Sequence, residues 1–319
     1  MRTSRRITKR LFQCEALETA EGLLDELSPH RGEHLFDRPD QGGWIFRGQA
    51  EAVWPLRPAA LRKDAFKGFI PGQIEMPSYT PEERRNLEAA LVNDFVSCAS
   101  AHGFEIPGDS QRLRDREHST RHEASDFPPL DQRGLYALAQ HYRVPTRLLD
   151  WTRRPLFAAY FAALGAADPD RKPDENGDGR LAVWAVQAEC VDGFLRTKDP
   201  GAVVVSVPTI SNPNLRAQRG EFTLVRFRTK PKDDHDIPDL DRLMEDERNV
   251  EDFRALPHQP SLPMMFKFTL PHSQARRLLH YLDVQGANHA TVYPGLHSIA
   301  AYMREASRRS AARPPRGDK

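Results

Sequence analysis

The sequence predicts an α+β fold in a single mixed domain, with a twisted β-sheet, continuous or split, flanked by helices. Three observations lead to this class. Apolar residues recur at helical spacing in the first half, short segments rich in β-branched and aromatic residues dominate the second half, and the two kinds alternate without a sustained βαβ rhythm. Because no GxGxxG motif follows a predicted strand, we expect neither a doubly wound dinucleotide-binding fold nor a TIM barrel.

The predicted elements of the first half are mostly helices. Thr80-Pro81-Glu82-Glu83 places a threonine, a proline and a glutamate at the spacing that begins a capped helix. Cys98 falls on the apolar face that follows, so we expect this cysteine to be buried. The segment Pro155–Leu164 is apolar nearly all round, so we expect this helix to be buried. The predicted elements are a short strand over Trp44–Phe46 and helices over Glu15–Ser28, from Thr80, over Gly134–Tyr142 and over Pro155–Leu164.

The second half predicts strands and two closing helices. Each strand segment carries β-branched or aromatic residues between turn signals. The predicted strands are Leu181–Gln187, Ala202–Val207, Phe222–Phe227 and Met264–Thr269, and the predicted helices are Pro271–Asp283 and Leu296–Ala306.

Composition favours a cytoplasmic protein with no membrane partner. The 319 residues include 46 Lys and Arg against 45 Asp and Glu, so global charge predicts no polyanion partner. No apolar stretch has the roughly 18 residues that a membrane span needs, and the basic N-terminus lacks the apolar region of a secretory signal. Three scattered cysteines, Cys14, Cys98 and Cys190, indicate a reducing compartment.

Local charge and turn residues predict the domain boundaries. We expect a helical lead-in over 1–40, one domain over 42–303 with surface insertions near 103–129, 168–179 and 229–252, and a basic, disordered tail over 304–319. The insertion near 229–252 is strongly acidic. His118 and His122 are spaced like metal ligands, but their charged surroundings hold no third ligand, so no metal is expected.

The first candidate site residue is Arg47, which follows three large apolar residues in the segment Trp44–Gln49. Burying a charge is costly unless something pairs with it, and a guanidinium offers a planar fork of donors to a carboxylate or a phosphate. Gly48 would allow close approach to the backbone, and Gln49 completes the polar end. A structural ion pair at the strand end explains Arg47 equally well.

The second candidate is the connection after the helix 134–142, which Pro145 forces to end near Tyr142. Arg147 and Asp150 would pair in a helical turn and point to opposite faces in an extended segment. A buried polar network that fixes the connection, with Asp150 capping the helix that begins at Pro155, is the alternative to a site. The polar and aromatic groups exceed what a connection needs and predict a site: Gln140, His141, Tyr142, Thr146, Arg147, Asp150, Trp151 and Thr152.

Five segments together resemble the FRG domain, which is named for its Phe-Arg-Gly motif, here Phe46-Arg47-Gly48. The resemblance covers roughly residues 42 to 303. It implies a bacterial protein in a toxin or phage-defence setting. The segments are WIFRGQ, AQHYRVPTRLLDWTRRPLFAAYF, VWAVQ, LRAQRGEFTL and GANHATVYPGLHSIAAYM.

The Phe-Arg-Gly run is also similar, more distantly, to ADP-ribosyltransferases of the arginine-bearing class. That similarity implies an ADP-ribosyltransferase-like sheet and NAD as co-substrate, with Arg47 on its phosphates or ribose and a nucleic-acid or protein acceptor. It further implies a carboxylate beside the ribose, for which Glu221 and Asp150 are the candidates. Glu221 departs by one residue from the loop spacing of that class. The alternative is a non-catalytic module that binds nucleic acid or a partner protein with the same residues.

Overall fold

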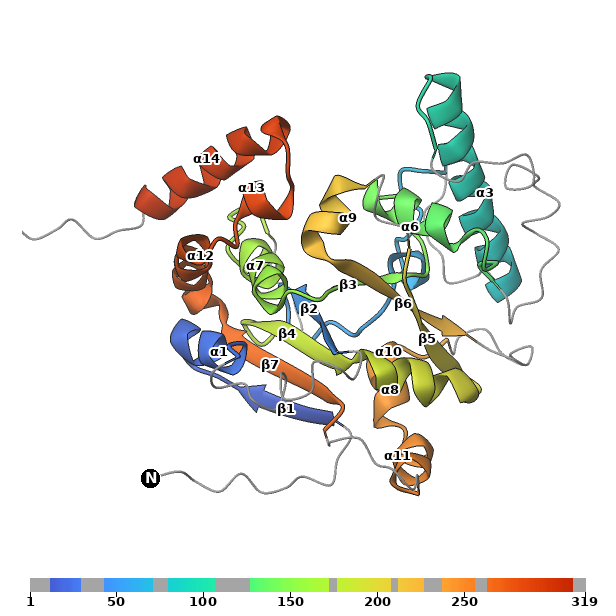
Figure 1. Ribbon diagram of the computed structural model, residues 1–319, viewed down its shortest axis with the longest axis horizontal. Helices are drawn as coiled ribbons and strands as arrows, with labels where there is room; N and C mark the ends of the chain where they lie inside the picture. Colours follow the sequence, from blue (N-terminus) through green and yellow to red (C-terminus); the bar gives the residue numbers. More distant parts are fainter. Residues whose placement is uncertain are drawn as a thin grey trace, which may run out of the picture.

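A mixed sheet of seven strands lies at the centre of this computed structural model (Figure 1). The structure describes residues 12–29, 43–70, 80–106, 127–171, 177–207, 212–226, 237–255 and 263–311. The strand order is β1-β7-β4-β2-β3-β6-β5, and every neighbouring pair is antiparallel except β1 with β7. The α+β class is therefore confirmed. The strands are β1 (Phe12–Ala16), β2 (Trp44–Gln49), β3 (Leu149–Thr152), β4 (Arg180–Gln187), β5 (Gly201–Val205), β6 (Gly220–Arg226) and β7 (Met265–Pro271).

The sheet is continuous but narrows to a single residue pair at its middle. Strand β2 pairs with β4 from Trp44 to Gln49, whereas Phe46 and Thr152 form the one pair that joins the two described strands β2 and β3. The sheet therefore has a left part, β1-β7-β4-β2, and a right part, β3-β6-β5. Beyond Phe46 the two parts separate, so Arg47 and Gly48 lie at the opening between them.

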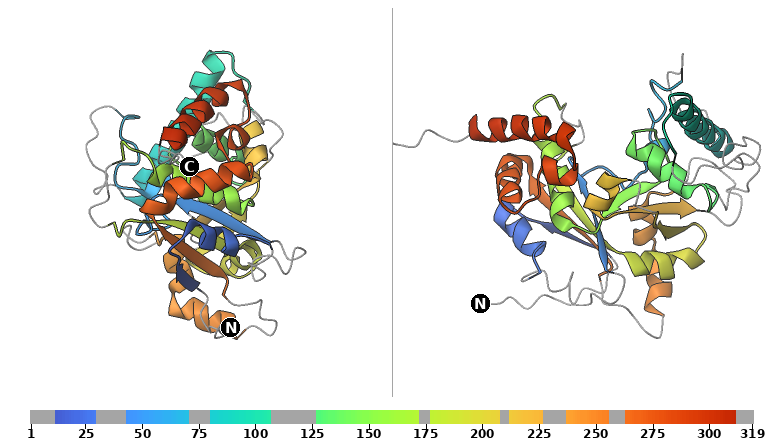
Figure 2. Two further views of the ribbon diagram at one scale, coloured as in Figure 1. Left: turned by 90° about the vertical axis from the view of Figure 1, so that its left-hand side faces the viewer. Right: turned by 45° about the horizontal axis from the view of Figure 1, so that its top comes forward.

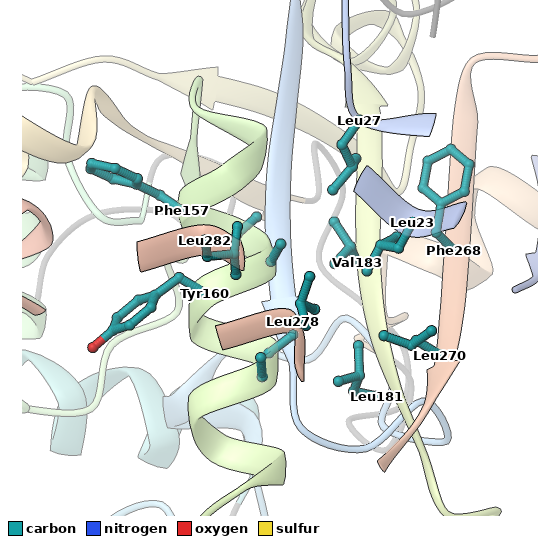
Figure 3. Close-up of a cluster of buried hydrophobic side chains, with 14 of the residues drawn as sticks. Leu23, Leu27, Phe157, Tyr160, Leu181, Val183, Phe268, Leu270, Leu278 and Leu282 are labelled. Atoms are coloured by element: carbon teal, nitrogen blue, oxygen red, sulfur yellow. The ribbon is translucent and has the colours of Figure 1, made fainter. Parts of the chain in front are cut away.

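Helices α1 (Ala20–Glu26), α7 (Pro155–Ala166) and α12 (Ala275–Val284) cover one face of the left part. Figure 3 shows Leu23 beside Val183 of β4 and Phe268 of β7, whereas the rings of Phe157 and Tyr160 project from the side of α7 away from these strands. Helix α7 also packs directly on the backbone of β2: a Cβ added to Gly48 would lie 1.9 Å from the carbonyl oxygen of Ala158. Only glycine fits at this position, because the obstacle is main chain and cannot rotate away.

The opposite face is covered by α8 (Ala188–Gly193), α10 (Leu240–Glu245) and α11 (Glu247–Arg254). Helices α10 and α11 belong to the acidic segment that was expected to form an insertion, yet Leu240, Leu243 and Met244 are buried in the core. Its acidic residues also hold the chain after β2. Asp239 Oδ1 lies 2.6 Å from Arg57 Nε, and Asp241 Oδ1 accepts a hydrogen bond of 3.0 Å from the backbone of Leu56.

The right part of the sheet packs against α3 (Pro81–Ala101), α6 (Arg133–His141) and α9 (Pro213–Gln218). The predicted start of α3 is confirmed: the backbone of Thr80 donates to Glu83 Oε2 at 2.8 Å, and its hydroxyl accepts from the backbone of Glu83. The predicted burial of Cys98 is wrong, because this cysteine is exposed. The buried stripe of α3 runs through Ala89, Val92 and Val96 instead, displaced around the helix from the predicted one.

The predicted helix over Glu15–Ser28 is wrong in its first residues. Strand β1 extends to Ala16, and α1 begins after Thr19, whose hydroxyl accepts from the backbone of Gly22 at 3.1 Å. The other predicted helices and strands are confirmed, with ends that differ by up to five residues, but β1, β3 and the short helices α8 to α11 were not predicted. The remaining elements are η1 (Ala59–Leu61), η3 (Leu195–Thr197), η4 (His272–Gln274), α13 (His289–Val292) and α14 (Leu296–Ala311).

Helices α14 and α3 lie at opposite ends of the molecule (Figure 2). Helix α14 extends to Ala311, into the segment expected as a tail. Residues 1–11, residues 312–319 and the pair His118 and His122 lie outside the described residues. No described helix has the length and apolar character required to cross a membrane.

Candidate functional site

Arg47 and Asp150 form an ion pair across the opening between β2 and β3. Arg47 Nη1 lies 2.6 Å from Asp150 Oδ2 and donates a second hydrogen bond of 2.7 Å to the backbone oxygen of Asp150. The Arg47 side chain is 13% exposed, whereas that of Asp150 is 58% exposed. The pair therefore ties the two parts of the sheet together and remains accessible to solvent.

Two residues of the predicted site hold the Asp150 carboxylate in place. Gln140 Nε2 donates to Asp150 Oδ1, and the buried hydroxyl of Thr146 donates to Gln140 Oε1. Crowding by the surrounding protein raises the pKa of Asp150, but the charge of Arg47 and the hydrogen bonds from Arg47 and Gln140 outweigh it. The pKa therefore lies below its usual value, and the carboxylate is ionised at neutral pH.

The Arg47–Asp150 pair contributes to two clefts. The first, which we call the histidine cleft, has a volume of about 730 Å³ and receives His289, Tyr293 and His297 from the C-terminal part of the chain. It contains most of the residues predicted from the sequence: Arg47, Gly48, Gln140, His141, Tyr142, Asp150, Trp151 and Thr152. Arg47 and residues of the 140–152 segment therefore meet in one solvent-accessible cleft.

The second cleft, which we call the cationic cleft, has a volume of about 880 Å³. Arg47, Gln140, Arg143 and Asp150 line it as well as the histidine cleft, so these four residues form the boundary between the two. Its other charged and aromatic lining residues come from the chain after β2: Trp54, Arg62, Lys63, Asp64 and Phe69.

Four predicted residues line neither cleft: Thr146, which binds Gln140 as described above, and Arg147, Gln49 and Glu221, which make structural contacts. Arg147 pairs with the buried Glu88, with Nε 2.8 Å from Oε2, so it does not pair with Asp150. Gln49 donates from Nε2 to the backbone of Pro55 at 3.1 Å and accepts from Trp184. Glu221 Oε1 lies 2.5 Å from Arg153 Nε. Of the two candidate carboxylates, only Asp150 lies in a cleft.

Trp151 and Thr152 contribute little side-chain surface to the histidine cleft. The Trp151 ring is in the core, and its Nε1 donates to Thr223 Oγ1 at 2.9 Å. Thr152 donates to the backbone of Gln218 and accepts from the backbone of Arg154 at 3.0 Å. Capping of α7 by Asp150, which was part of the alternative to a site, is therefore not found, because the side chain that meets the backbone at the start of this helix is that of Thr152.

Comparison with protein families shows that the model of the FRG domain matches residues 42–171 of this chain. This chain contains an FRG domain. The search of curated proteins and the search of solved structures each found no match.

The matched FRG region and the two clefts overlap unequally. Every residue that lines the cationic cleft, from Arg47 to Asp150, lies inside the matched residues. Part of the lining of the histidine cleft comes from residues that follow the matched region. One of these is Asn214, whose Nδ2 lies 3.0 Å from His141 Nε2. The FRG domain therefore supplies the Arg47–Asp150 pair and the whole cationic cleft, and later segments complete the histidine cleft.

Sequence reasoning missed several cleft residues of the FRG-domain protein. Arg143 lies inside the recognised block, but its backbone φ of +68° cannot be seen in a sequence. Arg62 and Lys63 follow no motif, and only the fold brings them to Asp150. His289 and Tyr293 lie in a stretch that marked the family without suggesting a role. Among the described residues, no group of three His, Cys, Asp or Glu is placed to bind a metal.

Proposed function

We propose that this FRG-domain protein binds NAD in the histidine cleft and transfers its ADP-ribose group to a nucleic-acid or protein acceptor. The observation that supports it is the Arg47–Asp150 pair, which places a guanidinium and an ionised carboxylate side by side in an open cleft. A cleft of about 730 Å³ is within the range of roughly 300–1,000 Å³ that is usual for small-molecule sites.

The guanidinium of Arg47 suits the diphosphate of NAD. The hydrogen bonds of this side chain to Asp150 both use Nη1, and its Nε is buried without a hydrogen-bond partner among the described residues. A buried donor without a partner is unfavourable, so an anion that reaches it would be stabilised. Arg143 lines the same cleft and adds a second positive charge. Because Asp150 already balances one positive charge, the two arginines leave one net positive charge for the diphosphate.

The carboxylate of Asp150 suits the ribose that carries the nicotinamide. In the proposed reaction the bond between the ribose C1′ and the nicotinamide nitrogen breaks, and its electron pair leaves with neutral nicotinamide. A nucleophilic O–H or N–H group of the acceptor then bonds to C1′ and releases its proton to solvent. Positive charge develops on the ribose during this exchange, and an ionised carboxylate nearby stabilises it. The lowered pKa of Asp150 favours this electrostatic role.

Aromatic side chains of the histidine cleft suit the planar groups of NAD. Tyr142 is 63% exposed and lies beside His141, with ring centroids 5.3 Å apart. Tyr293 faces the same cleft from the other side. Either ring offers a stacking surface for adenine or nicotinamide. Trp151 does not, because its ring belongs to the core.

The test is release of nicotinamide from labelled NAD by the purified full chain, with single-stranded DNA, RNA and casein offered as acceptors. We expect release by the wild type and by Glu221→Gln, and none by Arg47→Ala or Asp150→Asn. Circular dichroism of each variant checks that it is folded. The proposal fails if the wild type releases no more nicotinamide than Arg47→Ala with any acceptor.

The cellular setting is also a proposal. Cys14, Cys98 and Cys190 are free thiols, which suits the reducing cytoplasm. A bacterial toxin or phage-defence setting remains a prediction from the family resemblance. The non-catalytic alternative, a binding module for nucleic acid or protein, predicts ligand binding in the cationic cleft without any release of nicotinamide.

A further inference from the structure

The cationic cleft carries an excess of positive charge. Its lining includes four basic side chains, Arg47, Arg62, Lys63 and Arg143, and two carboxylates, Asp64 and Asp150. One of these carboxylates, Asp150, is already paired with Arg47. Like charges gathered in a concave surface repel one another, and an anionic ligand would relieve this repulsion.

The position of Arg62 is fixed by the fold. Its Nε and Nη2 both donate to the backbone oxygen of Arg57 at 3.2 Å, and Arg57 is itself held by Asp239. Desolvation by neighbouring groups and the positive charge of Arg47 both lower the pKa of Arg62, although this residue remains exposed to solvent, while Asp150 acts in the opposite direction. Arg62 is therefore held within electrostatic reach of Arg47, in a place that an anion would favour.

Two aromatic rings accompany these charges. Trp54 is 40% exposed and Phe69 is 45% exposed, and both line the cationic cleft. A groove that combines basic side chains with exposed aromatic rings is typical of proteins that bind single-stranded nucleic acid, because the bases stack and the backbone is neutralised. Bases inside a duplex already stack on each other and are not free to use such rings.

We infer that the cationic cleft binds a single strand of nucleic acid, with its phosphates along Arg62, Lys63 and Arg143 and a base on Trp54 or Phe69. The strand would then end at the Arg47–Asp150 boundary, beside the proposed NAD ribose. The proposed binding of the nucleic-acid strand depends only on the residues of the cationic cleft. Its role as the acceptor of ADP-ribose rests on the proposed function.

The test is fluorescence anisotropy with a labelled single-stranded oligonucleotide of about 12 residues, a length within the usual site sizes. The double variant Arg62→Ala/Lys63→Ala should bind at least tenfold more weakly. Its slope of log affinity against log salt concentration should fall by about 1.4, since each phosphate contact to a single strand contributes about 0.7. Trp54→Ala should weaken binding about fivefold to hundredfold through lost stacking.

The matched control removes two exposed arginines from helices away from the cleft, Arg276→Ala/Arg304→Ala, and should bind like the wild type. Equal binding by wild type and Arg62→Ala/Lys63→Ala, or equal loss in the control, would overturn the inference. So would a duplex that competes as well as the single strand, or binding of casein in place of the oligonucleotide.

Thermal stabilisation by NAD, measured on the same proteins, separates this inference from the proposed function. Arg62 and Lys63 do not line the histidine cleft, so their double variant should keep the stabilisation. A wild type that binds NAD and no oligonucleotide contradicts only the inference. A wild type that binds the oligonucleotide and no NAD contradicts the proposed function and the acceptor role, and supports the binding.

Discussion

The side chains of Arg47 and Asp150 come from positions 103 residues apart and meet at 2.6 Å, where strands β2 and β3 separate. Their ion pair bridges an opening that backbone hydrogen bonds do not close. It is also shared by two clefts of different character, one lined by histidines and one by cations. A ligand in either cleft can therefore reach the same guanidinium and carboxylate.

Replacing Arg143 by glycine should stabilise the protein and weaken ligand binding. Arg143 follows α6 with a φ of +68°, a conformation that costs a side-chain-bearing residue about 1 kcal/mol and that glycine adopts freely. We expect Arg143→Gly to raise the free energy of unfolding by about that amount and to weaken NAD and oligonucleotide binding. Arg219, at φ +46° and outside both clefts, supplies the control: Arg219→Gly should stabilise without affecting binding. Unchanged ligand affinity in Arg143→Gly would remove this residue from the site.

Gly48 should tolerate no side chain. A Cβ there would meet the backbone of α7 at 1.9 Å, so Gly48→Ala must displace a helix and should cost about 3 kcal/mol or more. Gly134→Ala is the control, since a Cβ at this helical position meets nothing within 4 Å and should leave stability equal or up to about 1 kcal/mol higher. Urea denaturation measures both. A Gly48→Ala protein as stable as the wild type would show that the packing of α7 on β2 does not require glycine at this position.

Arg147 should be structural. Its removal leaves the fully buried Glu88 without a cation, so Arg147→Ala should lower the free energy of unfolding by about 3–5 kcal/mol. Glu88→Gln with Arg147→Met should recover part of this loss, because no unpaired charge is then buried and the glutamine can still accept the hydrogen bond from the backbone N–H at position 147. NAD affinity per folded molecule should not change in either variant. If Arg147→Ala kept its stability and lost NAD binding, the assignment would be reversed.

Stability should fall as the pH is lowered below about 6.5, the usual pKa of histidine. Burial lowers the pKa of His141 and of His289, against the opposing charges of Asp150 and Glu305. The unfolded chain therefore takes up protons at a higher pH than the folded protein does, which favours unfolding in acid. Urea denaturation between about pH 7.5 and pH 5.5 should show the decline, and His141→Asn should make it shallower. A decline of unchanged slope in His141→Asn would exclude this residue as a cause.

Local patterns made much of the fold predictable. The capping box at Thr80 and the apolar segment after Pro155 identify their helices because their signals lie within a few residues. Strand β3 was not predicted because Leu149–Thr152 is only four residues long and lies between two predicted helices. Strand β1 was not predicted because Phe12–Ala16 contains no β-branched residue, and its last two residues were assigned to the following helix.

The candidate site was predictable in its position and not in its pairings. A buried arginine and a dense polar segment indicated Arg47 and the residues from 140 to 152. Which carboxylate meets which arginine depends on contacts between distant segments, so Arg147 could not be assigned to Glu88 from spacing. The cationic cleft could not be foreseen either, because Arg62 and Trp54 become neighbours of Asp150 only in the folded chain.

Titration calorimetry of NAD into the wild type, Arg47→Ala and Arg248→Ala tests the central claim most directly. Arg248 is an exposed arginine of α11 that pairs with Asp246. Its replacement removes the same charge as Arg47→Ala, but outside both clefts. We expect the wild type and Arg248→Ala to bind NAD equally and Arg47→Ala to bind it about tenfold to hundredfold more weakly, through lost charge-assisted hydrogen bonds. Equal binding by all three proteins, or no heat of binding from the folded wild type, would contradict an NAD site at Arg47.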